Sequence, residues 1–301
     1  MPIDKKSAPA CLAPDFLPRS PRVFFPENAC DSHAHVLGPI AKYVYSPQRV
    51  YTPPDCVAAD YIAMLKMLRV SRAVLVQPSV YGTNNEAMLD ALASNQQTPS
   101  GIEMRGVAVV DWGIPLAELR AMHELGVRGV RVNVVDVKDK TGNLPIVQLR
   151  SLADRIAPLG WHMEFLAHVD QYPSLDADVQ NFPVDVVFGH LGYVNCDKPF
   201  SKPGFEALLR LLKANRAWVK LTGPYRISSQ VLPHSDVIPL ARMLLDTAPD
   251  RVVWGTDWPH VMHKGPMPND GDIADLLVDW IPDQALRHAV LVGNPAKLYQ
   301  F

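Results

Sequence analysis

Two histidines one residue apart and a distant aspartate are the side chains of this chain best suited to carry out chemistry. His33 and His35 close a short apolar run at residues 29–36, near the start of the sequence. Side chains two apart on a strand point to the same side, so both imidazoles are expected to project from one strand end. Asp257 follows another apolar run, residues 251–255, near the other end. A fold that brings the first and last strands together would place all three side chains in one pocket.

Imidazoles and a carboxylate held in this way have two chemical uses. They can bind a divalent metal ion, or they can polarise a substrate oxygen and move protons. Two histidines separated by one residue are as often structural as functional when they stand alone. Asp257 could likewise only cap a turn, because Trp258 and Pro259 follow it. The functional interpretation therefore depends on the elements that bring these residues together.

Short apolar runs alternate with amphipathic stretches along the chain, which indicates strands separated by helices. Eight runs are expected to be strands, at residues 29–36, 73–77, 106–110, 129–133, 162–166, 184–189, 217–221 and 252–255. Helices are expected at residues 57–69, 85–97, 115–125, 146–158, 171–181, 203–214, 235–247, 272–281 and 283–291.

Strands this continuously apolar are buried on both faces, which suits a parallel sheet covered by helices. Eight strand–helix units predict a single closed α/β barrel of the (β/α)8 type over residues 29–301, a length close to the typical ~250 residues. An open, doubly wound sheet is the main alternative. It is disfavoured because no glycine-rich phosphate loop follows the first strand.

The first 28 residues differ from the rest of the chain. They contain several prolines and no hydrophobic periodicity. Such a segment is expected to be either an extended arm that wraps the body or a partly disordered tail.

The overall composition is that of an ordinary globular chain and excludes several classes of partner. The net charge of −2 provides no basic patch for nucleic acid and no polybasic run for a membrane surface. No apolar stretch approaches the ~20 residues of a membrane span, and the first residues lack the apolar core of a signal peptide. The four cysteines show no C-x-x-C spacing and are expected to be reduced thiols. A cytoplasmic enzyme is expected, either a monomer or a homodimer.

Polar side chains follow several predicted strands at their C-terminal ends, where barrel enzymes place their sites. His190 follows the sixth strand, and Arg226 follows the seventh. A lone histidine in such a position is more often structural than catalytic. Arg131 lies within the fourth strand, where an arginine needs an anionic partner, either an acidic side chain or a substrate carboxylate. Arg128, just before that strand, is expected closer to the surface.

Several motifs stand in one order along the chain. They are Asp31-Ser-His-Ala-His35, Val76-Gln-Pro-Ser79, Gly126-Val-Arg-Gly-Val-Arg-Val-Asn133, Gly189-His-Leu-Gly192 and Trp254-Gly-Thr-Asp-Trp-Pro-His260. In this combination the sequence resembles the amidohydrolase superfamily, and within it the branch of 2-pyrone-4,6-dicarboxylate lactonases and relatives that act on sugar-acid lactones. The resemblance implies a distorted (β/α)8 barrel and hydrolysis of a cyclic ester in aromatic- or sugar-acid catabolism.

The same resemblance implies roles for the polar residues. Asp257 matches the aspartate that activates the attacking water, and the histidines His33, His35 and His190 match those that polarise the lactone carbonyl or move protons. The expected substrate-binding residues are Arg128, Arg131, Arg226, Tyr51, Ser79, Tyr81, Tyr193 and His260. The arginines among them match those that surround substrate carboxylates.

Two departures from the family pattern narrow the expected substrate and cofactor. Tyr193 stands where the dicarboxylate lactonase has an arginine, so we expect a carboxylated or otherwise polar lactone with fewer charges. Leu166 replaces a strand-five residue that is a tyrosine in the lactonase and a metal-binding histidine in metal-dependent members. No lysine lies on the fourth strand to form the carbamate bridge of two-metal members. An enzyme without a cofactor is favoured, and the alternative is one zinc or manganese ion bound by His33, His35 and Asp257.

Lactone hydrolysis suits these groups, because hydroxide addition needs a base for the water proton and cationic or hydrogen-bonding groups for the oxyanion. Two alternatives within the superfamily remain open, namely a metal-dependent decarboxylase and a lactone isomerase. A third is a non-catalytic protein that binds a small molecule. The presence of all four residues His33, His35, His190 and Asp257 argues against that third alternative.

Overall fold

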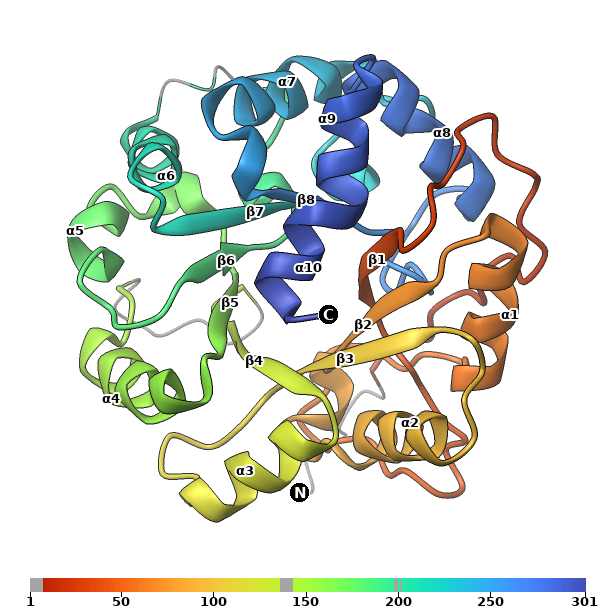
Figure 1. Ribbon diagram of the computed structural model, residues 1–301, viewed down its shortest axis with the longest axis horizontal. Coiled ribbons are helices and arrows are strands. Elements are labelled where there is room, and N and C mark those ends of the chain that lie inside the picture. The colour runs from red at the N-terminus through yellow and green to blue at the C-terminus, as the bar shows by residue number, and fades with distance from the viewer. Residues whose placement is uncertain (1–7, 136–142, 198–199, 201) are drawn as a thin grey trace, which may run out of the picture.

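Eight parallel strands follow one another around a ring, and each pairs with the next along the chain. The computed structural model describes residues 8–135, 143–197, 200 and 202–301. The strands in this part are β1 (Cys30–Ala34), β2 (Arg72–Val76), β3 (Glu103–Ala108), β4 (Val127–Asn133), β5 (His162–Leu166), β6 (Val186–Phe188), β7 (Ala217–Leu221) and β8 (Val252–Trp254). Their order and the helices between them confirm the predicted (β/α)8 barrel (Figure 1).

The described helices are α1 (Ala58–Leu68), α2 (Glu86–Gln97), α3 (Leu116–Glu124), α4 (Ile146–Ile156), α5 (Leu175–Val179), α6 (Pro203–Lys213), α7 (Ile238–Thr247), α8 (Asp270–Trp280), α9 (Gln284–His288) and α10 (Asn294–Tyr299). Helices α1 to α8 lie around the outside of the strands, whereas α10 lies across the centre of the ring (Figure 1). The helix expected at 171–181 is shorter than predicted, because Pro173 cannot continue a helix from the residues before it. Among the described helices, none is both long and apolar enough to cross a bilayer.

The seam between the first and last strands is held by one buried carboxylate. Asp31 of β1 is fully buried and accepts hydrogen bonds from the backbone N–H of Thr256 at 2.9 Å and from its hydroxyl at 2.6 Å. Just above, the N–H of Asp257 donates to the carbonyl of His33 at 2.9 Å. Sequence-distant strand ends are thereby fixed side by side, as expected from the position of the two motifs.

The opposite end of the barrel is closed by the C-terminal helix. In Figure 1, α10 crosses the centre of the ring of strands. Leu298 and Tyr299 of this helix pack with inward-facing side chains of the strands, including Val74, Val107 and Trp218. The barrel interior is therefore a packed core at this end, and the catalytic end of such barrels is the opposite one.

The N-terminal arm lies along the body wherever it is described. Ala10 pairs with Thr52 as an isolated parallel bridge. Arg19 and Arg22 form ion pairs with Asp272 and Asp275 of α8, at 2.6 and 3.0 Å. Residues 8–28 are therefore an extended wrap rather than a tail, and the rest of the predicted arm, residues 1–7, lies outside the described residues.

The seam makes stability sensitive to a single hydroxyl. Thr256→Val removes a donor from the buried Asp31 carboxylate and an acceptor from the N–H of Trp258. Because a buried polar group left without its partner costs about 1–3 kcal/mol, we expect the free energy of unfolding in urea to fall by about 2 kcal/mol. Thr247→Val, at a partly exposed threonine at the end of α7, is the matched control and should change it by less than about 0.5 kcal/mol. Equal losses in the two variants would contradict the role of the seam.

Candidate active site

A pocket of about 500 Å³ opens at the C-terminal ends of the strands. In barrels of this class, the loops at this end carry the functional side chains. Its lining includes His35, Tyr51, Ser79, Arg131, Leu166, His190, Tyr193, Tyr225, Arg226, His263 and Lys264. These residues come from both halves of the chain, so the pocket exists only in the closed ring.

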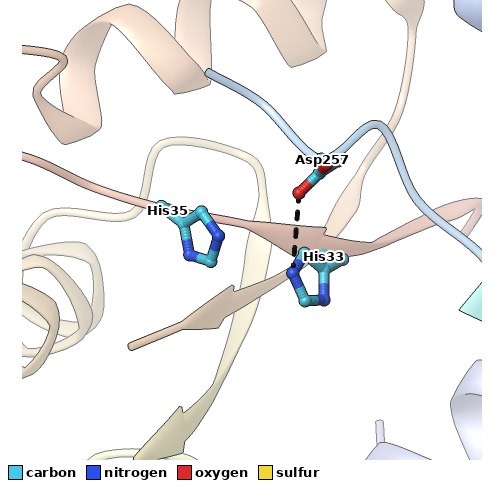
Figure 2. Close-up of side chains that lie close together, drawn as sticks. All are labelled: His33, His35 and Asp257. Atoms are coloured by element: carbon cyan, nitrogen blue, oxygen red, sulfur yellow. Dashed lines mark ion pairs between the residues drawn. The ribbon is translucent and has the colours of Figure 1, made fainter. Parts of the chain in front are cut away.

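His33, His35 and Asp257 meet at a floor beneath this pocket, as the sequence motifs predict, and His35 is the one of the three that lines the pocket itself. One ligand atom from each lies within 4.8 Å of the others. The nearest approach joins His33 Nε2 to Asp257 Oδ1 at 3.7 Å (Figure 2). Neither of these two atoms has a hydrogen-bond partner among the described residues. They are therefore free to bind a water molecule, a substrate oxygen or a metal ion.

The protonation state of His35 follows from its one hydrogen bond. Its Nδ1 lies 2.7 Å from the carbonyl oxygen of Val76. A carbonyl only accepts, so Nδ1 carries the proton and Nε2 presents a lone pair. Burial, together with the neighbouring His33 and Arg131, lowers the pKa of His35 to about 3. The side chain is thus a neutral acceptor and cannot donate a proton to a carbonyl oxygen.

A buried ion pair supports His33 from below. Lys220 of β7 lies 2.5 Å from a carboxylate oxygen of Glu164 of β5, and the other oxygen lies 3.3 Å from His33 Nδ1. Burial alone would raise the pKa of Glu164, but Lys220 and His33 outweigh it and hold this pKa well below its usual value. An ionised Glu164 accepts from Nδ1–H and so leaves the Nε2 lone pair of His33 facing Asp257.

Asp257 is held by two donors from the loop after β7. Arg226 Nε and the hydroxyl of Tyr225 donate to its Oδ2, at 2.6 and 2.7 Å. Burial would raise the pKa of Asp257, but Arg226 and the nearby imidazoles outweigh it and keep this pKa well below its usual value. The fit is tight, because a Cβ added to Gly223 would lie 2.6 Å from Asp257 Oδ2 and 3.0 Å from His190 Nδ1. The base is therefore ionised, and only its Oδ1 is available to a ligand.

His190 is oriented by Thr222, which follows β7. The hydroxyl of Thr222 accepts from the backbone N–H of His190 at 3.2 Å and lies 2.9 Å from its Nδ1. A hydroxyl that accepts from the N–H can donate to Nδ1, which places the imidazole proton on Nε2. Burial holds the pKa of His190 well below its usual value, so the ring is neutral. His190 is thus suited to donate a hydrogen bond into the pocket, unlike His35.

The structure places most of the predicted substrate-binding residues in the pocket wall. Tyr51, Ser79, Arg131 and Tyr193 line it. Arg131 is 7% exposed, and its Nη1 donates to the carbonyl of Gln77 at 3.1 Å. In the described part of the chain, no carboxylate oxygen lies within ion-pair distance of its guanidinium, and its Nε has no partner. The anionic partner expected for Arg131 is therefore not one of these side chains.

Three of the predicted residues have other contacts. Arg128 does not line the pocket, which corrects its expected place, because its Nη1 donates to the carbonyls of His123 and Val127. It is three residues from Arg131, so the two side chains leave β4 on opposite faces. The hydroxyl of Tyr81 accepts from the N–H of Gly38 at 2.8 Å and so fixes a loop. His260 is fully buried and lies behind Asp257 rather than in the wall.

Four residues that hold the side chains of the floor and His190 in place were not predicted. They are Glu164, Lys220, Thr222 and Tyr225. A signal for the first two was present, because a glutamate and a lysine stand within otherwise apolar strands and must have a partner there. Thr222 and Tyr225 act through contacts made by a loop, which no periodicity in the sequence reveals.

A family model described as amidohydrolase matches residues 30–301. The 4-sulfomuconolactone hydrolase of Hydrogenophaga intermedia is 35% identical over 296 residues, which cover 97% of this chain and 95% of that protein. The 2-pyrone-4,6-dicarboxylate hydrolase of Comamonas testosteroni is 36% identical over 94% of this chain and 93% of that protein. The D-galactarolactone isomerase of Agrobacterium fabrum is 28% identical over 93% of this chain and 94% of that protein.

Solved structures show the same similarity. A probable 2-pyrone-4,6-dicarboxylic acid hydrolase from Acinetobacter baumannii, with citric acid bound, has a TM-score of 0.77 at 28% identity, over 91% of this chain and all of that one. The corresponding protein from Pseudomonas putida has a TM-score of 0.75 at 31% identity, over 92% of this chain and 98% of that one. The chain therefore has the fold of these proteins.

The neutral, buried His35 predicts a loss of stability in acid. Its folded pKa of about 3 is below the 6.5 of an exposed histidine, so between these values only the unfolded chain binds the proton. Its contribution is present above pH 6.5 and is lost as the pH falls, by up to about 1.4 kcal/mol per pH unit. Asp31, whose pKa burial raises to about 6, contributes with the opposite sign.

A comparison with His35→Asn isolates the histidine, because Asp31 is common to both proteins. Urea unfolding between about pH 6 and pH 4.5 should show a free energy of unfolding that falls more steeply with acid in the wild type, by about 1 kcal/mol per pH unit. Equal slopes in the two proteins would show that His35 is not held neutral.

Proposed function

The chain belongs to the amidohydrolase family, and on that premise we propose that it hydrolyses a lactone that carries an acid group. Two relatives above 30% identity are named as hydrolases of 4-sulfomuconolactone and of 2-pyrone-4,6-dicarboxylate. The observation that carries the proposal is the buried guanidinium of Arg131, which lines the pocket without an ion-pair partner among the described residues. An acid group on the substrate is the partner that the side chain needs.

The charges around the pocket floor support the same substrate class. Glu164 and Asp257 contribute two negative charges, and Arg131, Lys220 and Arg226 contribute three positive ones. With neutral imidazoles these five side chains sum to +1, from three minus two, and the Asp31 carboxylate beside His33 brings the sum of the six to zero. The positive charge of Arg131 at the pocket wall is placed to attract an anionic ligand.

The geometry supports a simple sequence of steps. A water molecule that donates one proton to Asp257 Oδ1 and the other to the Nε2 lone pair of one of the two histidines loses the first proton to Asp257 as its oxygen adds to the lactone carbonyl. His190, through Nε2–H, stabilises the oxyanion, while Arg131 binds the acid group of the substrate. The ring C–O bond then breaks, and the leaving oxygen takes the proton from Asp257. The product is an open-chain acid.

The residues of the floor also fit a single divalent ion, which would be held by Nε2 of His33, Nε2 of His35 and Oδ1 of Asp257. When bound, such an ion would polarise the lactone carbonyl as a Lewis acid. Asp257 is the one carboxylate among these three ligands, and Arg226 already compensates its charge, which disfavours the addition of two more positive charges. We therefore propose that the reaction does not require a metal.

A lactone isomerase is the second candidate, because one relative carries that name at 28% identity. It would use the same base to move a proton and would return a lactone rather than an open acid. The cytoplasmic location, the choice between monomer and homodimer and the division at residue 28 stay predictions from the sequence.

Turnover of a lactone panel, with and without a chelator, tests the proposal. We expect wild-type protein to open an acid-bearing lactone at a rate that the chelator leaves unchanged, and Asp257→Asn to lower kcat by at least about 1000-fold because the base is lost. Proton NMR of the product separates opening from isomerisation. Activity that disappears with the chelator and returns with zinc or manganese would refute the metal-free mechanism, and an active Asp257→Asn variant would refute the role of the base.

Arg131 and Arg128 form a matched pair of arginines on one strand. Arg131→Met should raise KM for an acid-bearing lactone about 100-fold, the cost of about 2–3 kcal/mol for a buried charged hydrogen bond, and should leave a neutral lactone nearly unaffected. Arg128→Met, outside the pocket, should change neither constant by more than about twofold. Equal effects of the two substitutions, or an effect on the neutral lactone alone, would contradict an anion-binding Arg131.

A further inference from the structure

Behind Asp257, the half-buried Tyr225 and the buried His260 and Asp270 form a chain of contacts that the reaction steps above do not use. The hydroxyl of Tyr225 lies 2.7 Å from Asp257 Oδ2 and 3.0 Å from His260 Nδ1. On the far side of the ring, His260 Nε2 lies 3.2 Å from Asp270 Oδ1. His260, Asp270 and Asp257 are all fully buried. The chain thus leads from the first turn of α8 to the base.

The direction of the hydrogen bonds follows from donor and acceptor chemistry. The Asp257 carboxylate only accepts, so at 2.7 Å the single proton of the Tyr225 hydroxyl must point at it. The phenol oxygen then has only lone pairs left for His260, and Nδ1 must carry a proton that it donates to this oxygen. The reverse arrangement would leave two acceptor oxygens 2.7 Å apart with no proton between them.

The His260–Asp270 contact is of another kind. His260 Nε2 lies 3.2 Å from Asp270 Oδ1, within ion-pair distance, but among the described residues neither of these atoms, nor Asp270 Oδ2, has a hydrogen-bond partner. The buried Asp270 side chain therefore acts on the imidazole through its charge rather than through a hydrogen bond.

The backbone around these contacts adopts an uncommon conformation. His260 has φ of +58° and Asp257 has φ of +67°, a region that side chains other than glycine seldom adopt. Such conformations persist where the surrounding structure demands them, often at functional sites. The N-terminal arm covers the far end, since a Cβ on Gly271 would lie 2.1 Å from the carbonyl oxygen of Arg19. The arm thereby covers the start of α8.

We propose that His260 and Asp270 are positioning residues that act on Asp257 through Tyr225. By fixing the Tyr225 hydroxyl as a donor, they hold Oδ2 of the carboxylate and keep Oδ1 aimed into the pocket. Loss of the pair leaves Tyr225 free to rotate its proton towards other acceptors, so the base is present but misaligned. The inference rests on the proposed function, because Asp257 acts as the base only if the chain opens a lactone.

A double-mutant cycle on the full-length protein tests the coupling. His260→Gln and Tyr225→Phe should each lower kcat by about 10- to 100-fold and change KM by less than about threefold, because the defect lies in the alignment of the base. Combining them should cost no more than Tyr225→Phe alone, since His260 acts only through that hydroxyl. Asp270→Asn should resemble His260→Gln. Losses that multiply in the double variant, or an effect confined to KM, would overturn the proposal.

Two further measurements keep the result decisive. His234→Gln, at a buried histidine that contacts the carbonyl of Gln230 outside the pocket, is the matched control and should retain wild-type kcat. Nitrogen-15 NMR of the imidazoles, which needs no substrate and no folded variant, should show a protonated Nδ1 for His260 in the wild type. An unprotonated Nδ1 would overturn the proposal. If the wild type opens no lactone while this proton is present, the proposed function fails and the chain of contacts stands.

Discussion

A single buried carboxylate makes the rest of this site possible. Asp31 joins the first strand to Thr256 after the last, by two hydrogen bonds of 2.6 and 2.9 Å that span 225 residues of sequence. Two histidines and an aspartate from opposite ends of the chain face one another only because this seam is closed. The close fit continues at Gly255, where a Cβ would lie 2.8 Å from the Asp31 carboxylate. Closure of the barrel and assembly of the site are therefore one event.

Charge balance is the second constraint, and it explains why a buried site can hold so many ionisable groups. The Lys220–Glu164 pair compensates itself and fixes His33, while Arg226 compensates Asp257. A buried charge without a partner is costly, and Arg131 is the side chain left with that cost. Among the described residues, the Arg131 guanidinium has no ion-pair partner, so it is available to bind an anion.

The sequence predicts the barrel well because continuous apolar runs and amphipathic stretches report burial directly. It also predicts the meeting of His33, His35 and Asp257, since parallel strands in a ring share one C-terminal edge. The face of a strand from which each side chain projects is harder to predict. Arg128 and Arg131 are three positions apart on a strand, and counting alternate residues separates the one in the pocket from the one outside.

Contacts made by loops could not be predicted in the same way. His260 reaches Tyr225 because the backbone at residues 257 and 260 takes positive φ angles, which neither propensity nor periodicity encodes. The pairing of Glu164 with Lys220 depends on the stagger of strands two positions apart in the ring. Contacts of this kind depend on how the strands are arranged in space, which the sequence pattern does not specify.

The helix that seals the base of the barrel has a consequence for synthesis on the ribosome. Tyr299 lies under the charged layer, with the Lys220 ammonium 5.6 Å from its ring centroid, and it packs edge-on against His162. While a nascent chain still lacks β8 and α10, the first strand has no last strand beside it. The end of the barrel that α10 covers is then exposed. Apolar side chains of the first strands therefore stay exposed until the last strand and α10 have been synthesised.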